Sequence, residues 1–567
     1  MTRSAGAALV FVAVLTAACG PAGGRGPQTA AGNVEVRQDR ALSLVLRGEP
    51  TDLTSNCAGR CHIIRAMFTA PLVNAERGLS PVLGDVPQLG TDTWRVFSDG
   101  RMTTTYRLKP GLLWHDGAPL SAQDFVFARR VDAGSADLGL PPSSSVEARA
   151  IDEVLSPEPN VLVIRWSELY GDADSPILEP LPRHLLEAPL EAALGQRRGD
   201  LLFGHSYWTD EFAGLGPYRL ARWQHGAFLE ATAFDGYALG RPKIDKILVT
   251  WSTDPNVTLA RLLAGDSHLT MDEGIDFQQA VHLRREWSRT GGGVVTLAPV
   301  QNRYLGTQFR PAYSNPRALL DVRVRKASLH AIDREAVAHA LLEGEGVVAE
   351  TFAFPTEPFY DALYRVMEKY PHDLRRTEEL MRDAGFTRGA DGVYASPDEG
   401  RFAPEVLGVA EGVEGLEATA VTDYFRRAGI DAQLRLLPSS VLSRDNELKS
   451  TYPAFRGNQA MLPERITTSG VASAENRWSA VNKTGYSDPE HDRLYDLWTK
   501  TLEQGERDHL QIQMYKGMND NLPGLPLYYN YWVIAHSADL EGPLPRLPQY
   551  RSSARIYGNL YQWRWVG

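Results

Sequence analysis

Apolar and polar positions in the first half of the chain mostly follow the period of a β-strand. Residues Ala41–Leu53 alternate as a strand does, and Cys61–Val73 then shows helical spacing. Short alternating runs on either side of a Ser-Asp-Gly turn predict a hairpin over Gly90–Leu108. A Ser-x-x-Asp pattern predicts that a helix begins after Ser121. Further strands are expected at Val161–Trp166 and within Gly214–Leu248.

After Asp321 the pattern changes to helices that end at a glycine and alternate with strands. The predicted helices are Arg334–Glu343, Leu374–Ala384, Leu416–Ala428 and one that begins after Asp488 and Pro489. Asp254, Pro255 and Gly265 mark an earlier helix in the same way. The predicted strands are Ile430–Leu437 and the aromatic run Pro526–Ala535. Such alternation places helices against a sheet, so an α/β fold is expected.

The composition is that of a folded globular protein with several domains. A chain of 567 residues allows three or four domains at roughly 150 residues each. With 43% hydrophobic and 23% charged residues, the chain is too apolar for a disordered protein and too polar for a multispan membrane protein. The net charge of −11 offers no general attraction to a phosphate backbone. No nucleic-acid partner is expected.

An apolar, uncharged segment lies near the N-terminus. Ala5–Ala18, 14 residues long, is too short to span a bilayer and has the length of a signal-peptide core. The residues after Cys19 are rich in Gly, Pro and Ala without periodicity, as in a flexible linker. We therefore expect residues 1–18 to be a signal peptide and residues 19–40 to be a tether.

The residues around Cys19 resemble the lipobox of bacterial lipoproteins, in which the cysteine becomes the lipidated first residue of the mature chain. The sequence reads Leu15-Thr16-Ala17-Ala18-Cys19, so Thr16 stands where the motif has leucine. The alternative is an ordinary secretory signal with an incidental cysteine. The lipobox implies an exported protein, periplasmic or anchored to the outer face of the cytoplasmic membrane, whose only membrane contact is the lipid.

Two cysteines remain, Cys57 and Cys61, and an even pair in an exported protein predicts a disulfide. One helical turn would bring the two Cα atoms within about 6 Å, which a disulfide requires. Together with His62 the pair could hold a metal, but a structural site would then lack one ligand. Free thiols are the third alternative. The disulfide is the expected state, and no metal site is predicted.

Motifs of catalysis are absent from the sequence. It contains no G-x-S-x-G, H-E-x-x-H, P-loop or G-x-G-x-x-G pattern. Asp172 and Asp174 are spaced like the start of a calcium loop, but its glycine and distal glutamate are missing. A carboxylate pair for glycoside hydrolysis remains open, because only the tertiary structure forms such a pair. We expect no enzyme and no cofactor.

The segment Leu108–Phe127 (LKPGLLWHDGAPLSAQDFVF) resembles the signature of family 5 extracellular solute-binding proteins. That family comprises oligopeptide, dipeptide and nickel-chelate receptors of ABC importers. Further resembling blocks follow in the family's order, at Gly214–Leu220, Gly240–Leu248, Asp321–Ile332, Gly429–Leu437, Gly485–Asp492 and Leu525–Tyr529. Within the signature, Trp114 and His115 are expected to be packing and turn residues and not a site.

The resemblance implies a two-lobed α/β fold of the periplasmic-binding-protein type, with a hinge between the lobes and an extra subdomain in lobe one. Lobe one would comprise residues 41–299, with the subdomain at about 75–199. Lobe two would comprise residues 300–532, and residues 533–567 would return to lobe one.

In function, the resemblance implies a monomeric substrate-binding protein of an ABC transporter. It would capture a small solute, a peptide or another polar compound, in the cleft between the lobes and deliver it to the membrane permease. The alternatives are an exported hydrolase, a ligand-sensing protein or a folding helper on the same scaffold.

One stretch departs from the peptide receptors of the family, which carry an acidic loop that neutralises the ammonium group of the peptide. Here Phe455–Pro463 contains no acid, and the next one is Glu464. An unpaired buried ammonium would be costly, which favours a polar or anionic ligand instead. The candidate ligand-binding residues are Arg456, Asn458, Asn476, Trp478 and Asn482, with Arg477 and Lys483 beside them. The alternative for this region is a solvated loop.

The lipobox resemblance generates a direct test. The mature protein is expected to partition with membranes, and Cys19→Ser should release it because no thiol then remains to be lipidated. Fractionation followed by immunoblotting measures the distribution. If the substituted protein stays in the membrane pellet after a salt wash, the anchor is not a lipid on Cys19.

Overall fold

The computed structural model describes residues 40–54, 61–74, 80–134, 136–139, 145–272, 274–544 and 558–566. The chain divides into two units, residues 1–39 and 40–567, and the architecture below is that of the second. The predicted signal peptide, Cys19, the tether up to residue 39 and Cys57 lie outside the described residues, and so does the side chain of Cys61. Lipidation and the disulfide therefore stay predictions.

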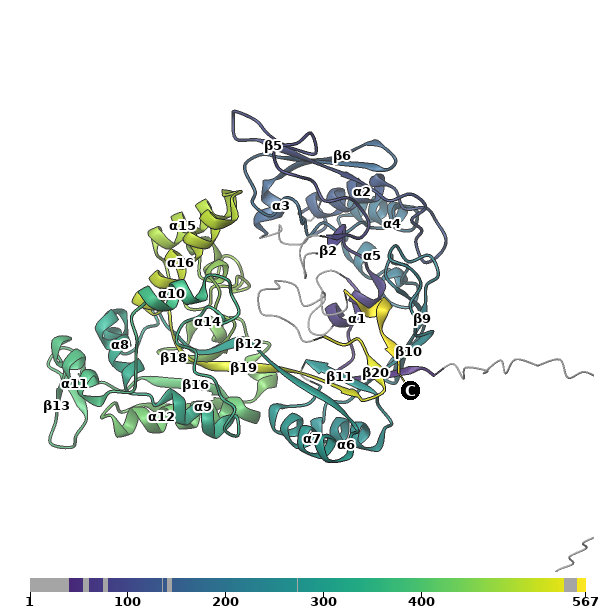
Figure 1. The fold of residues 1–567 in the computed structure, drawn as a ribbon. Coiled ribbons are helices and arrows are strands. Elements are labelled where there is room, and N and C mark those ends of the chain that lie inside the picture. The colour runs from purple at the N-terminus through teal and green to yellow at the C-terminus, as the bar shows by residue number, and fades with distance from the viewer. Residues whose placement is uncertain are drawn as a thin grey trace, which may run out of the picture. The chain divides into compact units, whose positions relative to one another are not determined.

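A ten-stranded mixed sheet runs through the second unit (Figure 1). From one edge its strands are β17 (Gln433–Leu437), β16 (Glu405–Val409), β18 (Phe455–Gln459), β12 (Gly293–Thr307), β19 (Gly524–Ser537), β11 (Leu269–Asp272), β1 (Leu42–Leu46), β10 (Lys246–Trp251), β9 (Phe228–Ala233) and β8 (Tyr218–Gln224). Strands from the early part of the chain occupy one end, and strands from the later part occupy the other. We call these two parts lobe one and lobe two.

The long antiparallel pair β12 and β19 connects the two ends of the sheet. The strands have 15 and 14 residues, and their pairing extends from Gly293 opposite Ser537 to Gly306 opposite Gly524. At one end β19 pairs with β11 of lobe one, and at the other end β12 pairs with β18 of lobe two. This pair is therefore the connection through which the two lobes share one sheet.

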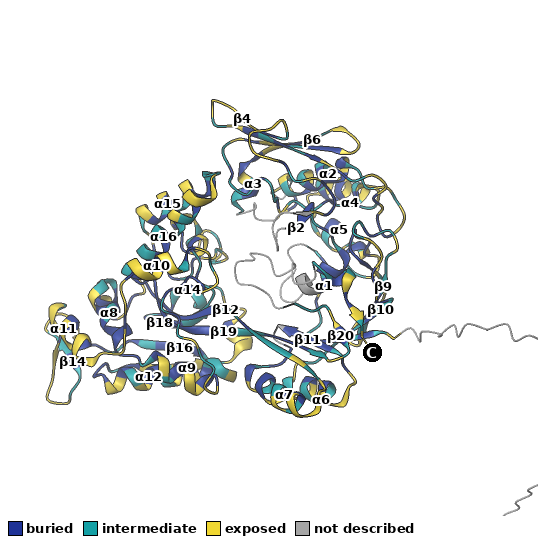
Figure 2. Ribbon diagram, viewed as in Figure 1, coloured by how far each residue is buried: buried dark blue, intermediate teal, exposed yellow. Residues whose placement is uncertain are grey.

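Each lobe has its own hydrophobic core. The core of lobe one lies between the strands β1, β8, β9 and β10 and the helices α1 (Cys61–Phe68) and α4 (Arg183–Gln196), and it includes Trp563 near the C-terminus. The core of lobe two lies between the strands β16, β18 and β19 and the helices α8 (Val322–His330), α9 (Arg334–Leu341), α11 (Leu374–Asp383) and α12 (Gly412–Arg427). Figure 2 shows α11 and α12 exposed on their outer faces and buried toward the rest of lobe two. No helix among the described residues is long and apolar enough to cross a membrane.

A third core belongs to a smaller antiparallel sheet near the top of Figure 1. Its strands, in spatial order, are β4 (Trp94–Val96), β5 (Met102–Arg107), β7 (Val161–Trp166) and β6 (Ile151–Glu158), and α2 (Ala122–Ala133) packs against them. The predicted hairpin is confirmed as β4 and β5. The predicted helix start is confirmed as well, because the Ser121 amide donates to Asp124 Oδ2 at 2.9 Å.

The signature segment attaches this subdomain to lobe one. His115 is 8% exposed; its Nδ1 accepts the amide of Gly214 at 3.0 Å, and its Nε2 donates to the carbonyl of Gly216 at 3.1 Å. Burial lowers the pKa of this imidazole to about 4, which keeps it neutral. Trp114 is 2% exposed. The expectation that both residues serve packing and turn formation is confirmed.

Several predicted boundaries differ from the observed ones for local reasons. Helix α12 begins at Gly412, before the predicted Leu416, because its first turn contains two glycines that carry no apolar pattern. Strand β17 begins at Gln433 and not at Ile430, because Gly429 adopts φ +88° and the residues after it close the end of α12. By contrast, α6 (Pro255–Ala264) has the predicted cap at Asp254 and ends at Gly265 with φ +78°.

A buried ion pair fastens the connecting strands to lobe two. Arg303 on β12 is 3% exposed and donates to both carboxylate oxygens of Glu417 on α12, at 2.9 and 2.7 Å. Tyr528 on β19 donates its hydroxyl to the same carboxylate at 2.7 Å. A second acid, Glu414, pairs with Arg303 at 2.7 Å but is 43% exposed. One carboxylate thus joins β12, β19 and α12.

This arrangement predicts that replacing Glu417 lowers the free energy of unfolding more than replacing Glu414 does. Glu417→Gln should lower the free energy of unfolding by about 3 to 5 kcal/mol, because it leaves Arg303 buried without its main counter-charge. Glu414→Gln is the matched control, and it should cost less than about 1 kcal/mol because its carboxylate is solvated. Chemical denaturation of both variants measures the difference. Equal losses would contradict a central role for Glu417.

Candidate functional site

A cavity of about 440 Å³, here called the central cavity, lies beside the connecting strands. Its wall includes Gln301 of β12, Trp532 of β19 and Asp172, which follows strand β7 of the subdomain. Lobe two supplies residues of the helices α15 (Pro489–Lys500) and α16 (Gln504–Asn521) and the loop residues Phe354, 357–359, Ala460 and 462–465. Its volume is that of a typical small-molecule site, about 300 to 1,000 Å³.

Aromatic rings form much of this wall. The ring centroids of Phe359 and Tyr515 lie 5.7 Å apart in a stacked pair, and those of Tyr495 and Trp498 lie 5.9 Å apart. The Arg507 guanidinium lies 4.4 Å from the Trp498 ring centroid. Such flat, rigid surfaces bind aliphatic or planar groups of a ligand.

The charged residues of the wall carry both signs. Arg507 pairs with Asp172 at 2.7 Å, and Asp508 accepts a hydrogen bond from Gln504 at 2.7 Å. Glu464 and Arg465 are exposed, and among the described residues neither side chain forms a hydrogen bond or an ion pair. One carboxylate and one guanidinium are therefore available to a bound solute.

Buried Asn302 shapes the loop that lines the cavity. Its Oδ1 accepts the amide of Met461 at 2.9 Å, and its Nδ2 donates to the carbonyls of Met461 and Phe352. Met461 is 1% exposed and belongs to the core, while Ala460 next to it has φ +60°. This turn presents Ala460, Leu462 and Glu464 to the cavity. The stretch singled out in the sequence thus borders the site, but with a methionine buried in it and no acid before Glu464.

None of the five candidate ligand-binding residues is among the described residues that line the central cavity. Asn482 is 1% exposed, donates to the carbonyls of Thr467 and Tyr486, and accepts from Thr484 and Gly485. Asn476 bonds the backbone of Val471 and Ser473, and Asn458 accepts the amide of Gln459. All three amides shape turns and strand ends. Their role in ligand binding stays a prediction.

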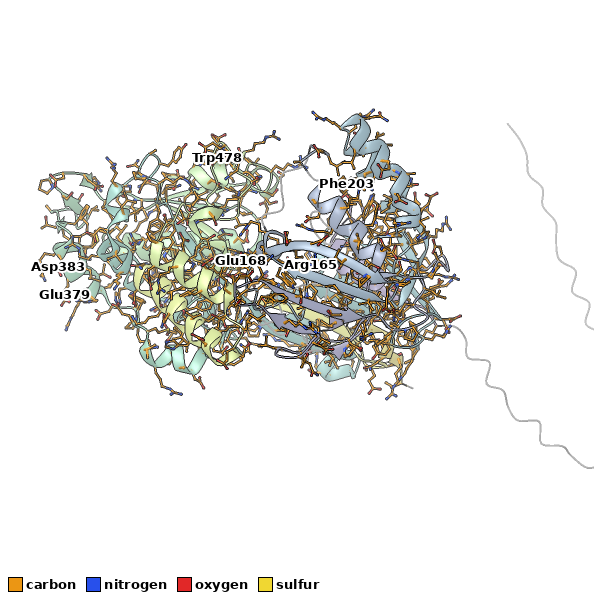
Figure 3. All side chains as sticks on the ribbon, turned by 90° about the horizontal axis from the view of Figure 1, so that it is seen from above. Arg165, Glu168, Phe203, Glu379, Asp383 and Trp478 are labelled. Atoms are coloured by element: carbon orange, nitrogen blue, oxygen red, sulfur yellow. The ribbon has the colours of Figure 1, made fainter. Side chains whose placement is uncertain are left out.

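The other two candidates each take part in a contact between a guanidinium and an aromatic ring. Trp478, labelled in Figure 3, is half-buried, and its ring centroid lies 5.8 Å from the Arg310 guanidinium. Arg456 is 6% exposed, and its guanidinium lies 5.7 Å from the ring centroid of Tyr452. Their role in ligand binding also stays a prediction.

The subdomain and lobe two touch at the rim of the central cavity. The Gly171 amide donates to the carbonyl of Thr499 at 2.7 Å, and Glu168, labelled in Figure 3, pairs with Lys500 at 2.9 Å. The ion pair of Asp172 and Arg507 completes this set, which we call the rim contact. Asp172 therefore belongs to a contact between subdomain and lobe and not to a calcium loop.

Sequence patterns gave no sign of most residues at this site. Asn302 and Arg507 are polar residues that are buried, which a hydrophobic period cannot show. Two signals were available: the acid-free stretch Phe455–Pro463, which borders the cavity, and the aromatic character of the predicted strand Pro526–Ala535, on which Trp532 lines it.

The chain is similar in sequence to known solute-binding proteins. A profile of the bacterial extracellular solute-binding proteins, family 5 (middle region), matches residues 86–465. The dipeptide-binding protein of Escherichia coli (strain K12) is 23% identical over 482 residues, which cover 79% of this chain and 81% of that protein. The oligopeptide-binding protein AppA of Bacillus subtilis (strain 168) is 24% identical over 457 residues, 78% of each chain.

Solved structures share the fold. NikZ from Campylobacter jejuni in complex with Ni(L-His) gives a TM-score of 0.73 at 21% identity, covering 93% of this chain and 100% of that chain. The oligopeptide-binding protein from Thermus thermophilus complexed with a pentapeptide gives 0.73 at 20% identity, covering 93% and 96%. These likenesses confirm the predicted two-lobed α/β fold of the periplasmic-binding-protein type. Because the profile matches more than half of its residues, the chain belongs to the bacterial extracellular solute-binding proteins of family 5.

Proposed function

We propose that this protein is the extracytoplasmic substrate-binding protein of an ABC importer, which captures a small solute and delivers it to the membrane permease. The observation that carries the proposal is the central cavity, to which β12, β19, lobe two and the subdomain all contribute. A site of this kind gains affinity when hinge motion encloses the ligand, and it needs no chemical step. The solute is released unchanged.

We also propose a division of the chain into two lobes, a lipid anchor at the membrane and one disulfide. Lobe one comprises residues 41–299 with the subdomain at about 75–199, lobe two comprises residues 300–532, and residues 533–567 return to lobe one. A lipid on Cys19 holds the monomer at the outer face of the membrane, and a disulfide joins Cys57 and Cys61. The lipobox-like residues and the tether composition support the anchor. The separate cores and the long pair β12 and β19 support the division into lobes.

The wall of the central cavity suits a solute with both a flat or aliphatic part and polar ends. The stacked rings can bind the flat or aliphatic part, while Glu464 and Arg465 are available to the polar ends. A free peptide would have to place its ammonium at Glu464 or at Asp508, whose hydrogen-bond donor is the neutral amide of Gln504, because Phe455–Pro463 contains no acid. We therefore propose a polar solute other than an ordinary peptide.

The solute can be identified directly in the purified protein. Ligand released from the purified protein by denaturation and analysed by mass spectrometry should be one small polar compound. Adding it back at 100 times its dissociation constant stabilises the folded state by about 2.7 kcal/mol, which raises the Tm by a few degrees. Di- to pentapeptides should leave the Tm unchanged. A strong, sequence-tolerant response to peptides would overturn the ligand class, and turnover of the compound would overturn the receptor function.

Gly171 tests whether the rim contact belongs to the ligand-bound state. A Cβ added at Gly171 would lie 2.5 Å from the carbonyl oxygen of Thr501, so Gly171→Ala should hinder the contact. Overpacking of this kind costs about 1 to 3 kcal/mol, which predicts roughly a tenfold to hundredfold loss of affinity. The Tm of the ligand-free protein should hardly change. Binding is measured by calorimetry with the solute identified above.

The matched control is Gly195→Ala on α4, where an added Cβ meets nothing within 4 Å. This variant should bind as the parent protein does. If both glycine variants bind normally, the rim contact is not part of the bound state.

A further inference from the structure

Four cations gather on lobe two without acidic partners. They are Arg310, which follows β12, Lys449 on α14 (Leu448–Thr451), Arg456 on β18, and Lys483 in the loop before α15. Among the described residues, none of the four forms an ion pair with a carboxylate. This is unusual in a chain whose net charge is −11. We call these four residues the cation cluster.

Arg456 is the most deeply buried member. Its side chain is 6% exposed, its Nε is fully buried without a hydrogen-bond partner, and no other described residue accepts from its guanidinium. The hydroxyl of Tyr452, whose ring centroid lies 5.7 Å away, is also buried without a partner. Buried polar groups are almost always hydrogen-bonded, and a buried charge without a partner is costly. Arg456 Nε and the hydroxyl of Tyr452, two neighbouring residues in space, therefore each lack an acceptor among the described residues.

Arg310 fixes the backbone around this place. Its guanidinium donates to the carbonyls of Ser450 at 2.8 Å, Lys483 at 2.9 Å and Ala472 at 2.6 Å. These bonds tie together the segments that carry Lys449 and Lys483. Because every acceptor is neutral, the charge of Arg310 stays uncompensated.

Lys449 and Lys483 each donate to a backbone carbonyl, and burial together with the neighbouring positive charges lowers the pKa of Lys483. Lys483 donates to the carbonyl of Trp478, and Lys449 donates to the carbonyl of Ser443 at 2.8 Å. Burial, followed by the charges of Lys449, Arg456 and Arg310, lowers the pKa of Lys483 to about 8. An ammonium has three donors, so each lysine retains two for another acceptor.

We propose that Lys449, Arg456 and Lys483, with the Tyr452 hydroxyl, bind a compact oxyanion of the phosphate or carboxylate type. Such an anion supplies the acceptors that Arg456 Nε and Tyr452 lack, and it neutralises charges that the protein leaves unpaired. None of these residues lines the central cavity, so binding of a free anion here would not depend on the proposed transport function. The anion is either free in solution or an acidic group of a larger solute.

Inorganic phosphate is the probe. Thermal melts at constant ionic strength, with chloride as the reference salt, should show a saturable rise of a few degrees in the Tm of the full chain. Lys483→Met should abolish this rise. Without phosphate, the same variant should melt no lower than the parent, because it removes an uncompensated charge. This pair of effects separates a lost binding site from a damaged fold.

Two further variants complete the test. Lys449→Met, on a different segment, should also abolish the rise, which covers the case in which Lys483→Met fails to fold. Lys326→Met is the matched control, because Lys326 is also largely buried but is paired with Glu368 at 2.6 Å, and it should keep the full response. A parent protein without a saturable response, or variants that respond as the parent does, would overturn the site.

A competition experiment distinguishes the source of the anion. If the site holds an acidic group of the transported solute, phosphate should weaken solute binding and Lys483→Met should lower solute affinity. If the site holds a free anion, phosphate should raise the Tm equally with and without the solute. Both results support the site, and neither requires that the solute be a peptide.

Discussion

The bond between Arg303 and Glu417 is the constraint on which the arrangement of this protein depends. It buries one full ion pair where β12 leaves the connecting region and enters lobe two, and Tyr528 adds β19 to the same carboxylate. Buried pairs contribute less to stability than to geometry, because desolvation offsets most of their attraction. Here the pair fixes how β12 and β19 sit on α12, and those two strands carry the sheet from one lobe to the other.

The central cavity follows from that geometry. Gln301 and Trp532 line it from the connecting strands, and Asn302, the neighbour of Gln301, holds the loop that forms another part of the wall. The residues that face a solute thus lie on or next to the elements about which the lobes would move. A change in the angle between the lobes changes the cavity and the rim contact together, which is how a binding protein couples ligand capture to its shape.

Charge is distributed unevenly in the molecule. The chain as a whole is acidic, yet lobe two keeps Arg310, Lys449, Arg456 and Lys483 together with no acid paired to any of them in the part of the chain that is described. A core selected for stability alone would pair or remove these charges. Their retention next to two unbonded donors indicates that the place is shaped for an acceptor from outside the chain.

The sequence by itself determined the local structure and the fold class. Ser121 with Asp124, Asp254 with Gly265, and Gly429 each act on backbone groups a few residues away, so their effects could be predicted without knowledge of the rest. The collinear motif blocks likewise predicted the family, because they preserve turns and packing positions.

Only the tertiary structure decided the sites. Helix α16 buries Arg507 and Asn519 beside Leu510 and Met514, so its buried face does not follow hydrophobicity. The central cavity joins residues from Asp172 to Trp532, and Arg310 bonds the backbone of Lys483 across 173 positions of sequence. Burial and pairing of a charge depend on which distant segments pack around it. The sequence pattern does not show which distant segments will meet. That is settled only when the sheet brings them together.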